Sequence, residues 1–65
     1  MNEADAIKLA KIFGGEAWHS GGQIWLVRLT NADGKLVVFS DELVSDYANE
    51  ADFEKGKPIQ TITLI

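Results

Sequence analysis

The side chains in this 65-residue sequence that could act as a catalytic base or nucleophile are one histidine and three serines, and there is no cysteine. His19 and Ser20 are neighbours in a segment with strand character, so their side chains point to opposite faces and cannot work as a base and a nucleophile. We interpret His19 as a half-exposed strand residue. Because a nucleophile, a base and an orienting group are hard to assemble from one histidine and three serines, the sequence predicts a protein that is not an enzyme.

The glycines and acids also lack the spacing of established ligand sites. Gly14-Gly15 and Gly21-Gly22 match neither a phosphate-binding loop nor a dinucleotide fingerprint, so we interpret both pairs as turns. The acids near Asp33 and from Asp41 onward lack the alternating ligands and closing glutamate of a calcium loop. Without cysteine no thiolate site can form either, and we expect neither a metal nor another cofactor.

The net charge of −4 comes from one short stretch of the chain. Acids and bases balance over residues 1–40, whereas residues 41–54 contain acids and no base. These acids are the predicted partner-binding residues: Asp41, Glu42, Asp46, Glu50, Asp52 and Glu54. This negative charge disfavours binding to nucleic acids or anionic membranes, which are themselves negatively charged, and favours a basic protein partner.

The spacing of these acids predicts a charged helix face. Ser40 is a suitable N-cap, and the apolar residues that follow fit a helical stripe over residues 41–54, with a bend near Asn49. Three acids then recur every four residues, about 6 Å apart along one face: Glu42, Asp46 and Glu50. Such a ladder is either a solvated face that keeps the protein soluble or a surface complementary to a basic groove.

The remaining segments predict a single α+β domain over residues 1–65. Asn2 caps a helix over residues 3–13, and a proline opens a final strand over residues 59–65. Three strands lie between, over residues 16–20, 23–30 and 35–40. The predicted order is αβββαβ, with a four-stranded, mostly antiparallel sheet, a meander plus a C-terminal strand, and both helices packed on one face. The last strand is expected parallel to the first and third strands, beside either of them.

The second predicted strand is apolar on both of its faces, although two helices on one side cover only one face. The other face needs loops or another chain to cover it, so a homodimeric structural or regulatory domain that uses its apolar sheet face is an alternative function. One tryptophan is expected in the core and the other at an interface, and the sequence does not choose between them. The candidate interface residues are Trp18, Trp25 and Val27.

Two segments near the carboxyl end resemble a known family. The stretch from Asp46 to Phe53, followed by Gln60 to Leu64, resembles the acidic helix and last strand of small phage-encoded anti-CRISPR proteins. The hairpin around Asn31 to Gly34 is similar in its place along the chain. The resemblance implies a non-enzymatic inhibitor that mimics DNA, whose carboxylates occupy the basic cleft where a CRISPR effector reads its short recognition motif. The same six acids would then contact the partner.

The amino-terminal residues carry no recognisable targeting signal. The stretch from Met1 to Asp5 is acidic and lacks the basic and apolar regions of a secretory signal. No apolar run has the length of a transmembrane helix. We therefore expect a cytoplasmic protein.

Overall fold

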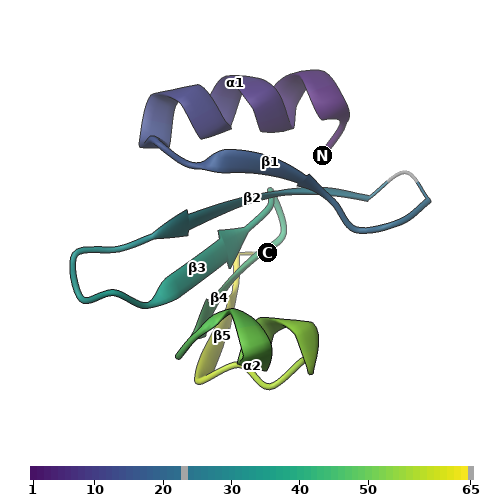
Figure 1. The fold of residues 1–65 in the computed structure, drawn as a ribbon. Coiled ribbons are helices and arrows are strands. Elements are labelled where there is room, and N and C mark those ends of the chain that lie inside the picture. Colours follow the sequence, from purple (N-terminus) through teal and green to yellow (C-terminus); the bar gives the residue numbers. More distant parts are fainter. Residues whose placement is uncertain (23, 65) are drawn as a thin grey trace.

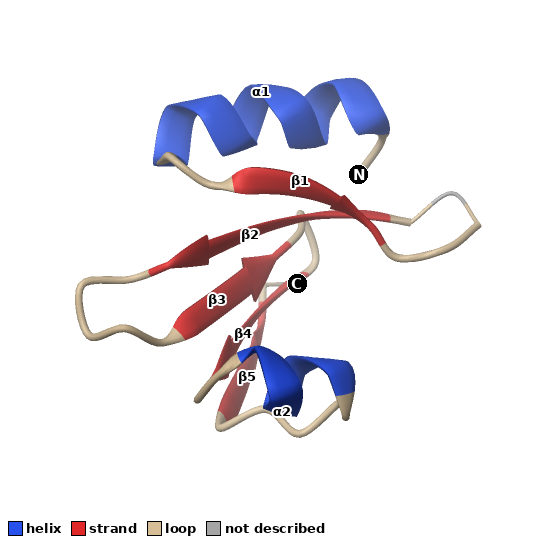
Figure 2. Ribbon diagram, viewed as in Figure 1, coloured by secondary structure: helices blue, strands red, loops and turns tan. Residues whose placement is uncertain are grey.

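Two helices and a five-stranded antiparallel sheet make up the fold, seen in a computed structural model that describes residues 1–22 and 24–64 (Figure 1). The elements in chain order are α1 (Glu3–Phe13), β1 (Glu16–His19), β2 (Trp25–Thr30), β3 (Leu36–Phe39), β4 (Leu43–Tyr47), α2 (Glu50–Glu54) and β5 (Gln60–Thr63). The strands lie side by side in chain order, and their direction turns strongly from β1 to β5 (Figure 2). The predicted α+β class is confirmed.

Helix α1 has the bounds that the sequence predicts. The Asn2 side chain accepts a hydrogen bond from the Asp5 amide at 2.9 Å, which satisfies one of the free donors of the first turn. The helix ends at Gly14, whose φ of 74° is left-handed. Ala6 and Ala10 are buried. Neither α1 nor α2 is long and apolar enough to cross a membrane.

The sheet register divides the side chains between two faces, because residues directly opposite one another point to the same side. We call one side the α1 face; a row across it contains Ala17, Val27, Phe39, Val44 and Ile62. We call the other side the α2 face; a row across it contains Glu16, Arg28, Val38, Ser45 and Thr61. The three predicted strands are confirmed as β1 to β3, and Gln23 lies outside the described residues.

The predicted helix over residues 41–54 was wrong for its first half, where β4 forms a strand. Ser40 makes the bond that suggested a helix cap, since its hydroxyl accepts from the Glu42 amide at 3.1 Å. The Ser40 amide also donates to the Leu43 carbonyl at 2.9 Å. The bond between the Ser40 hydroxyl and the Glu42 amide therefore belongs to a hairpin turn and not to a helix cap. Buried Ser45 interrupts the apolar alternation that would have indicated a strand.

The position of the last strand follows from this extra strand. β5 runs antiparallel to β4, with Leu43 opposite Thr63, so the predicted parallel pairing beside the first or third strand was wrong. Because β4 reverses the chain once more, a short connection suffices to bring β5 back along it. That connection contains α2, which Asn49 caps at the predicted bend by accepting from the Asp52 amide at 2.8 Å. Ile65, the predicted end of this strand, lies outside the described residues.

The helices lie on opposite faces of the sheet, so the prediction that both pack on one face was also wrong. α1 packs on β1 and β2, where Val27 is 0% exposed beneath it. α2 carries Phe53, whose ring meets Trp18 and Tyr47 edge-on at 5.9 and 5.3 Å. Both rings project from the α2 face. Each helix covers part of a different side (Figure 1). This arrangement buries apolar surface on both faces of the sheet, which one helix layer could not do.

Candidate interaction surfaces

Arg28 is the centre of the contacts that hold α2 to the sheet. Its side chain is 11% exposed, and its guanidinium lies 4.6 Å from the Trp18 ring centroid and 5.4 Å from that of Phe53. Its Nε atom lies 3.3 Å from a Glu16 carboxylate oxygen, and Nη2 donates to the Glu50 carboxylate. The cation therefore connects β1, β2 and α2 through stacking and two ion pairs.

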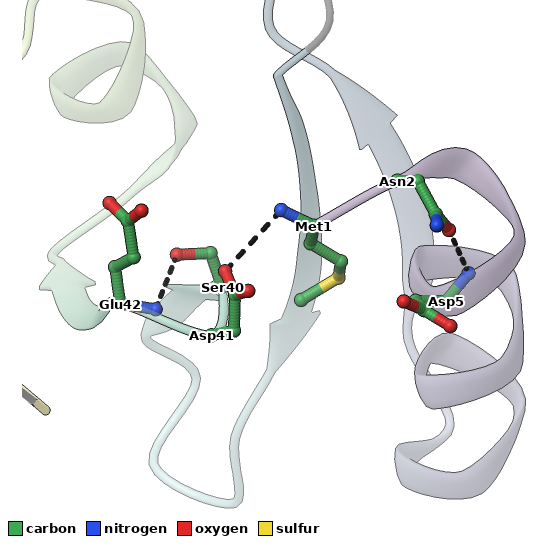
Figure 3. Close-up of polar contacts among 6 residues, drawn as sticks. All are labelled: Met1, Asn2, Asp5, Ser40, Asp41 and Glu42. Atoms are coloured by element: carbon green, nitrogen blue, oxygen red, sulfur yellow. Dashed lines mark hydrogen bonds and ion pairs between the residues drawn. The ribbon is translucent and has the colours of Figure 1, made fainter.

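Two of the predicted partner-binding acids are engaged within the chain. Glu50 is paired with Arg28, as above. An Asp41 carboxylate oxygen lies 3.3 Å from the Met1 amino nitrogen (Figure 3). The neighbouring Glu42 carboxylate points away from that ion pair in the same view. Asp41 and Glu50 are thus partly neutralised by cations of their own chain.

The predicted ladder of three acids on one helix face was wrong, because β4 is extended. Glu42 precedes β4 and Glu50 follows it in α2, so the two acids do not share one helix. Asp46 points to the α1 face, whereas Glu50 meets Arg28 on the α2 face. The structure thus divides the six acids between the β3–β4 turn, the α1 face of β4, and α2. Within residues 1–22 and 24–64, four of them make no ion pair: Glu42, Asp46, Asp52 and Glu54.

A row of apolar side chains runs from the last residue of α1 across the α1 face to β5; within it, half-buried Phe39 also packs against the α1 core. We call it the open patch, and its members are Phe13, Phe39, Val44, Ile62 and Leu64. Phe13 is 58% exposed and its ring meets Phe39 edge-on at 5.4 Å. Phe39 lies opposite Val44, and Val44 lies opposite Ile62, which is 50% exposed. Leu64 is exposed and, by strand alternation, points to the same side as Ile62.

The three predicted interface residues have different environments. Val27 is completely buried beneath α1 and offers no surface to a partner. Trp25 is half-buried against the α1 core, and its ring stacks on His19 at 4.7 Å. Trp18 is the more exposed tryptophan, but one side of its ring is covered by Arg28 and Phe53. Trp25 therefore contributes to packing within the chain, whereas Trp18 combines packing against Arg28 and Phe53 with an exposed part of its ring.

The residues considered for catalysis are held in structural contacts. The His19 Nε2 atom lies 2.7 Å from the Gly22 carbonyl oxygen, next to a shallow hollow between Trp25 and the amino-terminal residues. Ser45 is buried and shares a hydrogen bond of 3.0 Å with Thr61, while Ser40 closes the turn before β4. In the described part of the chain, no three histidine, aspartate or glutamate side chains lie close enough together to hold a metal ion.

Two features of these surfaces were not found from the sequence. Arg28 was counted only as one charge among the balanced residues, because its partners Glu16 and Glu50 are distant in the chain. Phe13 was not among the predicted interface residues, although it stands at the last position of α1, beyond the region that packs on β2. A terminal aromatic residue followed by two glycines was the available signal.

No known protein family, curated protein or solved structure matches this chain. Its function is therefore inferred from the geometry of its surfaces.

Proposed function

We propose that this protein is a non-enzymatic interaction domain that binds a protein partner through the open patch. The observation that carries this proposal is the continuous row of apolar side chains from Phe13 to Ile62, across α1, β3, β4 and β5. Contiguous apolar surface of this kind is characteristic of protein-binding sites, whereas single exposed apolar residues are ordinary. The structural engagement of His19, Ser40 and Ser45 supports binding over catalysis.

The surroundings of the open patch indicate the chemistry of the partner. Asp46 lies on the same face, beside Val44 along β4. Glu42 adjoins the other end, since its carbonyl accepts from the Leu64 amide at 2.8 Å. An apolar centre with an acidic rim fits a partner whose own apolar site has lysines and arginines around it. A basic protein is therefore the favoured class of partner.

Replacing Phe13 by serine should reduce partner binding about tenfold or more, because an exposed aromatic side chain in an interface often contributes about 1.4 kcal/mol or more. The matched control is Ile12→Ser, which changes an apolar residue that is 65% exposed on the neighbouring position of α1. The measurement is quantitative pull-down from lysate of the native host, with circular dichroism to verify the fold. Equal capture by both variants would contradict a role for the open patch.

A second candidate is the acidic inhibitor that the resemblance to anti-CRISPR proteins suggests, a DNA mimic acting on a basic nucleic-acid-binding protein such as a CRISPR effector. It is favoured by the four acids that make no ion pair among the described residues, since these retain their charge for a partner. Because the ladder is broken, such mimicry would use acids in three places: Glu42 before β4, Asp46 on the α1 face of β4, and Asp52 and Glu54 in α2.

The inhibitor candidate predicts a charge-dependent effect. Glu54→Lys should weaken binding to the basic partner about fivefold at low salt and less at high salt, because exposed charges are screened. Asp33→Lys, an identical change of charge in the β2–β3 turn, is the control. The measurement is competition between this protein and duplex DNA for the captured partner. Absence of competition would remove DNA mimicry and leave the open-patch proposal intact.

A further inference from the structure

The outer edge of β5 is an open hydrogen-bonding edge. Within the described residues β5 pairs with β4 alone, at the end of the strand order. The Leu64 amide donates toward β4, and ladder groups alternate in direction along an antiparallel strand. The backbone N–H and C=O groups of Thr61 and Thr63 therefore face away from β4. Unpaired groups of this kind form a template for another strand.

The residues of this edge lack the features that normally block strand addition. From Pro58 to Leu64 there is no charged side chain, although the whole protein carries a charge of −4. Charged residues, prolines and bulges are the usual protection of an exposed edge. Gln60–Thr63 contains no charged residue and no proline, and Pro58 lies before the strand. β1, the other edge strand, carries the charged Glu16 and lies close to α2 through the Trp18 and Phe53 rings. β5 is thus the less protected edge.

The charges at the two ends of β5 are complementary to those of a second copy. Lys55 and Lys57 precede the strand, and Glu42 lies beside its far end. Antiparallel pairing of two β5 strands directs the basic end of each copy toward the acidic end of the other. Elsewhere, contact between two copies of an acidic protein brings like charges together.

From these observations we infer that two copies of this protein pair through antiparallel β5 strands, forming a continuous ten-stranded sheet. The twofold axis passes beside Ile62, so Thr61 of each copy exchanges backbone hydrogen bonds with Thr63 of the other. Ile62 then lies opposite its own counterpart, in a pair that makes no backbone hydrogen bonds to each other. The axis is perpendicular to the sheet, so both open patches lie on one side and join. This interface uses the strand edge and does not require the proposed function to be correct.

Thr63→Pro tests the inference directly, because proline removes an outward N–H without removing a bond to β4. Sedimentation equilibrium from low micromolar to millimolar concentration should show the wild type approaching twice the monomer mass. The variant should have a dimer dissociation constant about tenfold higher or more, since symmetry removes two hydrogen bonds. Thr63→Val, which keeps the N–H, is the control and should dimerise like the wild type.

A cysteine cross-link tests the register and remains informative if the proline variant does not fold. The chain has no cysteine, so Ile62→Cys introduces a single thiol at the twofold axis. Opposed residues of such a pair have Cα atoms about 4.5 Å apart, within disulfide range. Sheets stacked face to face lie about 10 Å apart, which is too far. Ile62→Cys should form a covalent dimer rapidly under mild oxidation, and Ile12→Cys on α1 should not.

The outcomes separate this inference from the proposed function. A wild type that stays monomeric at every concentration overturns the inference, as does a dimer that resists Thr63→Pro and does not cross-link at position 62. The second result would indicate self-association through another surface, such as the open patch. Phe13 lies away from β5, so Phe13→Ser should leave the dimer dissociation constant unchanged while it reduces partner capture. Failure of partner capture alone contradicts the proposed function and not the dimer.

Discussion

Replacing Gly15 by alanine should lower the free energy of unfolding by about 3 kcal/mol, the largest effect expected of this substitution at any of the six glycines. A Cβ atom at this position would lie 2.5 Å from the Arg28 carbonyl oxygen and 3.0 Å from the Leu29 Cβ atom. The first of these is backbone in β2, which cannot rotate away. The variant must therefore move α1 and β1 relative to β2.

Gly14→Ala provides the matched control, because this neighbouring position has space for a methyl group but a backbone conformation that alanine disfavours. In the part of the chain that the structure describes, no atom would lie within 4 Å of a Cβ atom at this position, but its φ of 74° is unfavourable for alanine. That conformation costs about 1 kcal/mol. Urea denaturation of both variants compares the two costs. If Gly14→Ala is as destabilising as Gly15→Ala, backbone conformation and not close packing determines the α1–β1 connection.

Replacing Arg28 by alanine should lower the free energy of unfolding by about 2 kcal/mol and loosen α2 from the sheet. Most of this effect comes from lost stacking of the guanidinium and its aliphatic stem against Trp18 and Phe53. The two ion pairs contribute less, about 0.5 kcal/mol each, because Glu16 and Glu50 are exposed to water. Partly opposing these gains, the buried Nη1 atom has no hydrogen-bond partner among residues 1–22 and 24–64.

This division of the Arg28 effect can be measured. Glu50→Gln removes one ion pair and leaves the stacking, so it should cost about a quarter of the Arg28→Ala effect and depend on salt. Lys35→Ala, in the β2–β3 loop, removes an exposed cation and should be close to neutral. Urea denaturation gives the free energies, and near-ultraviolet circular dichroism reports the tryptophan environment. A Glu50→Gln effect equal to that of Arg28→Ala would show that charge, not stacking, holds α2.

The joined sheet proposed for two copies would also affect how a partner binds. Each open patch ends at β5, so pairing of two β5 strands would bring both Ile62 side chains to the centre of one larger apolar surface. A partner that spans both halves would then stabilise the dimer, since binding that favours one state shifts the equilibrium toward it. The two proposals are separate, but together they describe one surface that extends over both copies.

The sequence alone determined the features that depend on local bonds and short spacings. The helix from residues 3 to 13 was predictable because its cap, its charge pattern and its terminal glycine all lie within one segment. The first three strands were predictable for the same reason, since β-branched and aromatic residues alternate between two turns. The bend at Asn49 and the existence of the last strand were also predicted, although the strand that pairs with the last one was not.

Only the tertiary structure decided whether residues 41–47 form a helix or a strand, because their local sequence signals fit both. The Ser40 hydroxyl makes the same bond in a hairpin turn as in a helix cap. A helix here would have left β3 and β5 without the strand that now lies between them, so pairing on both sides of β4 favours the strand. Because β4 is a strand, the acids lie apart, Arg28 pairs with Glu50, and α2 lies on the face opposite α1. None of these contacts is local in sequence, which is why the charge pattern alone could not reveal them.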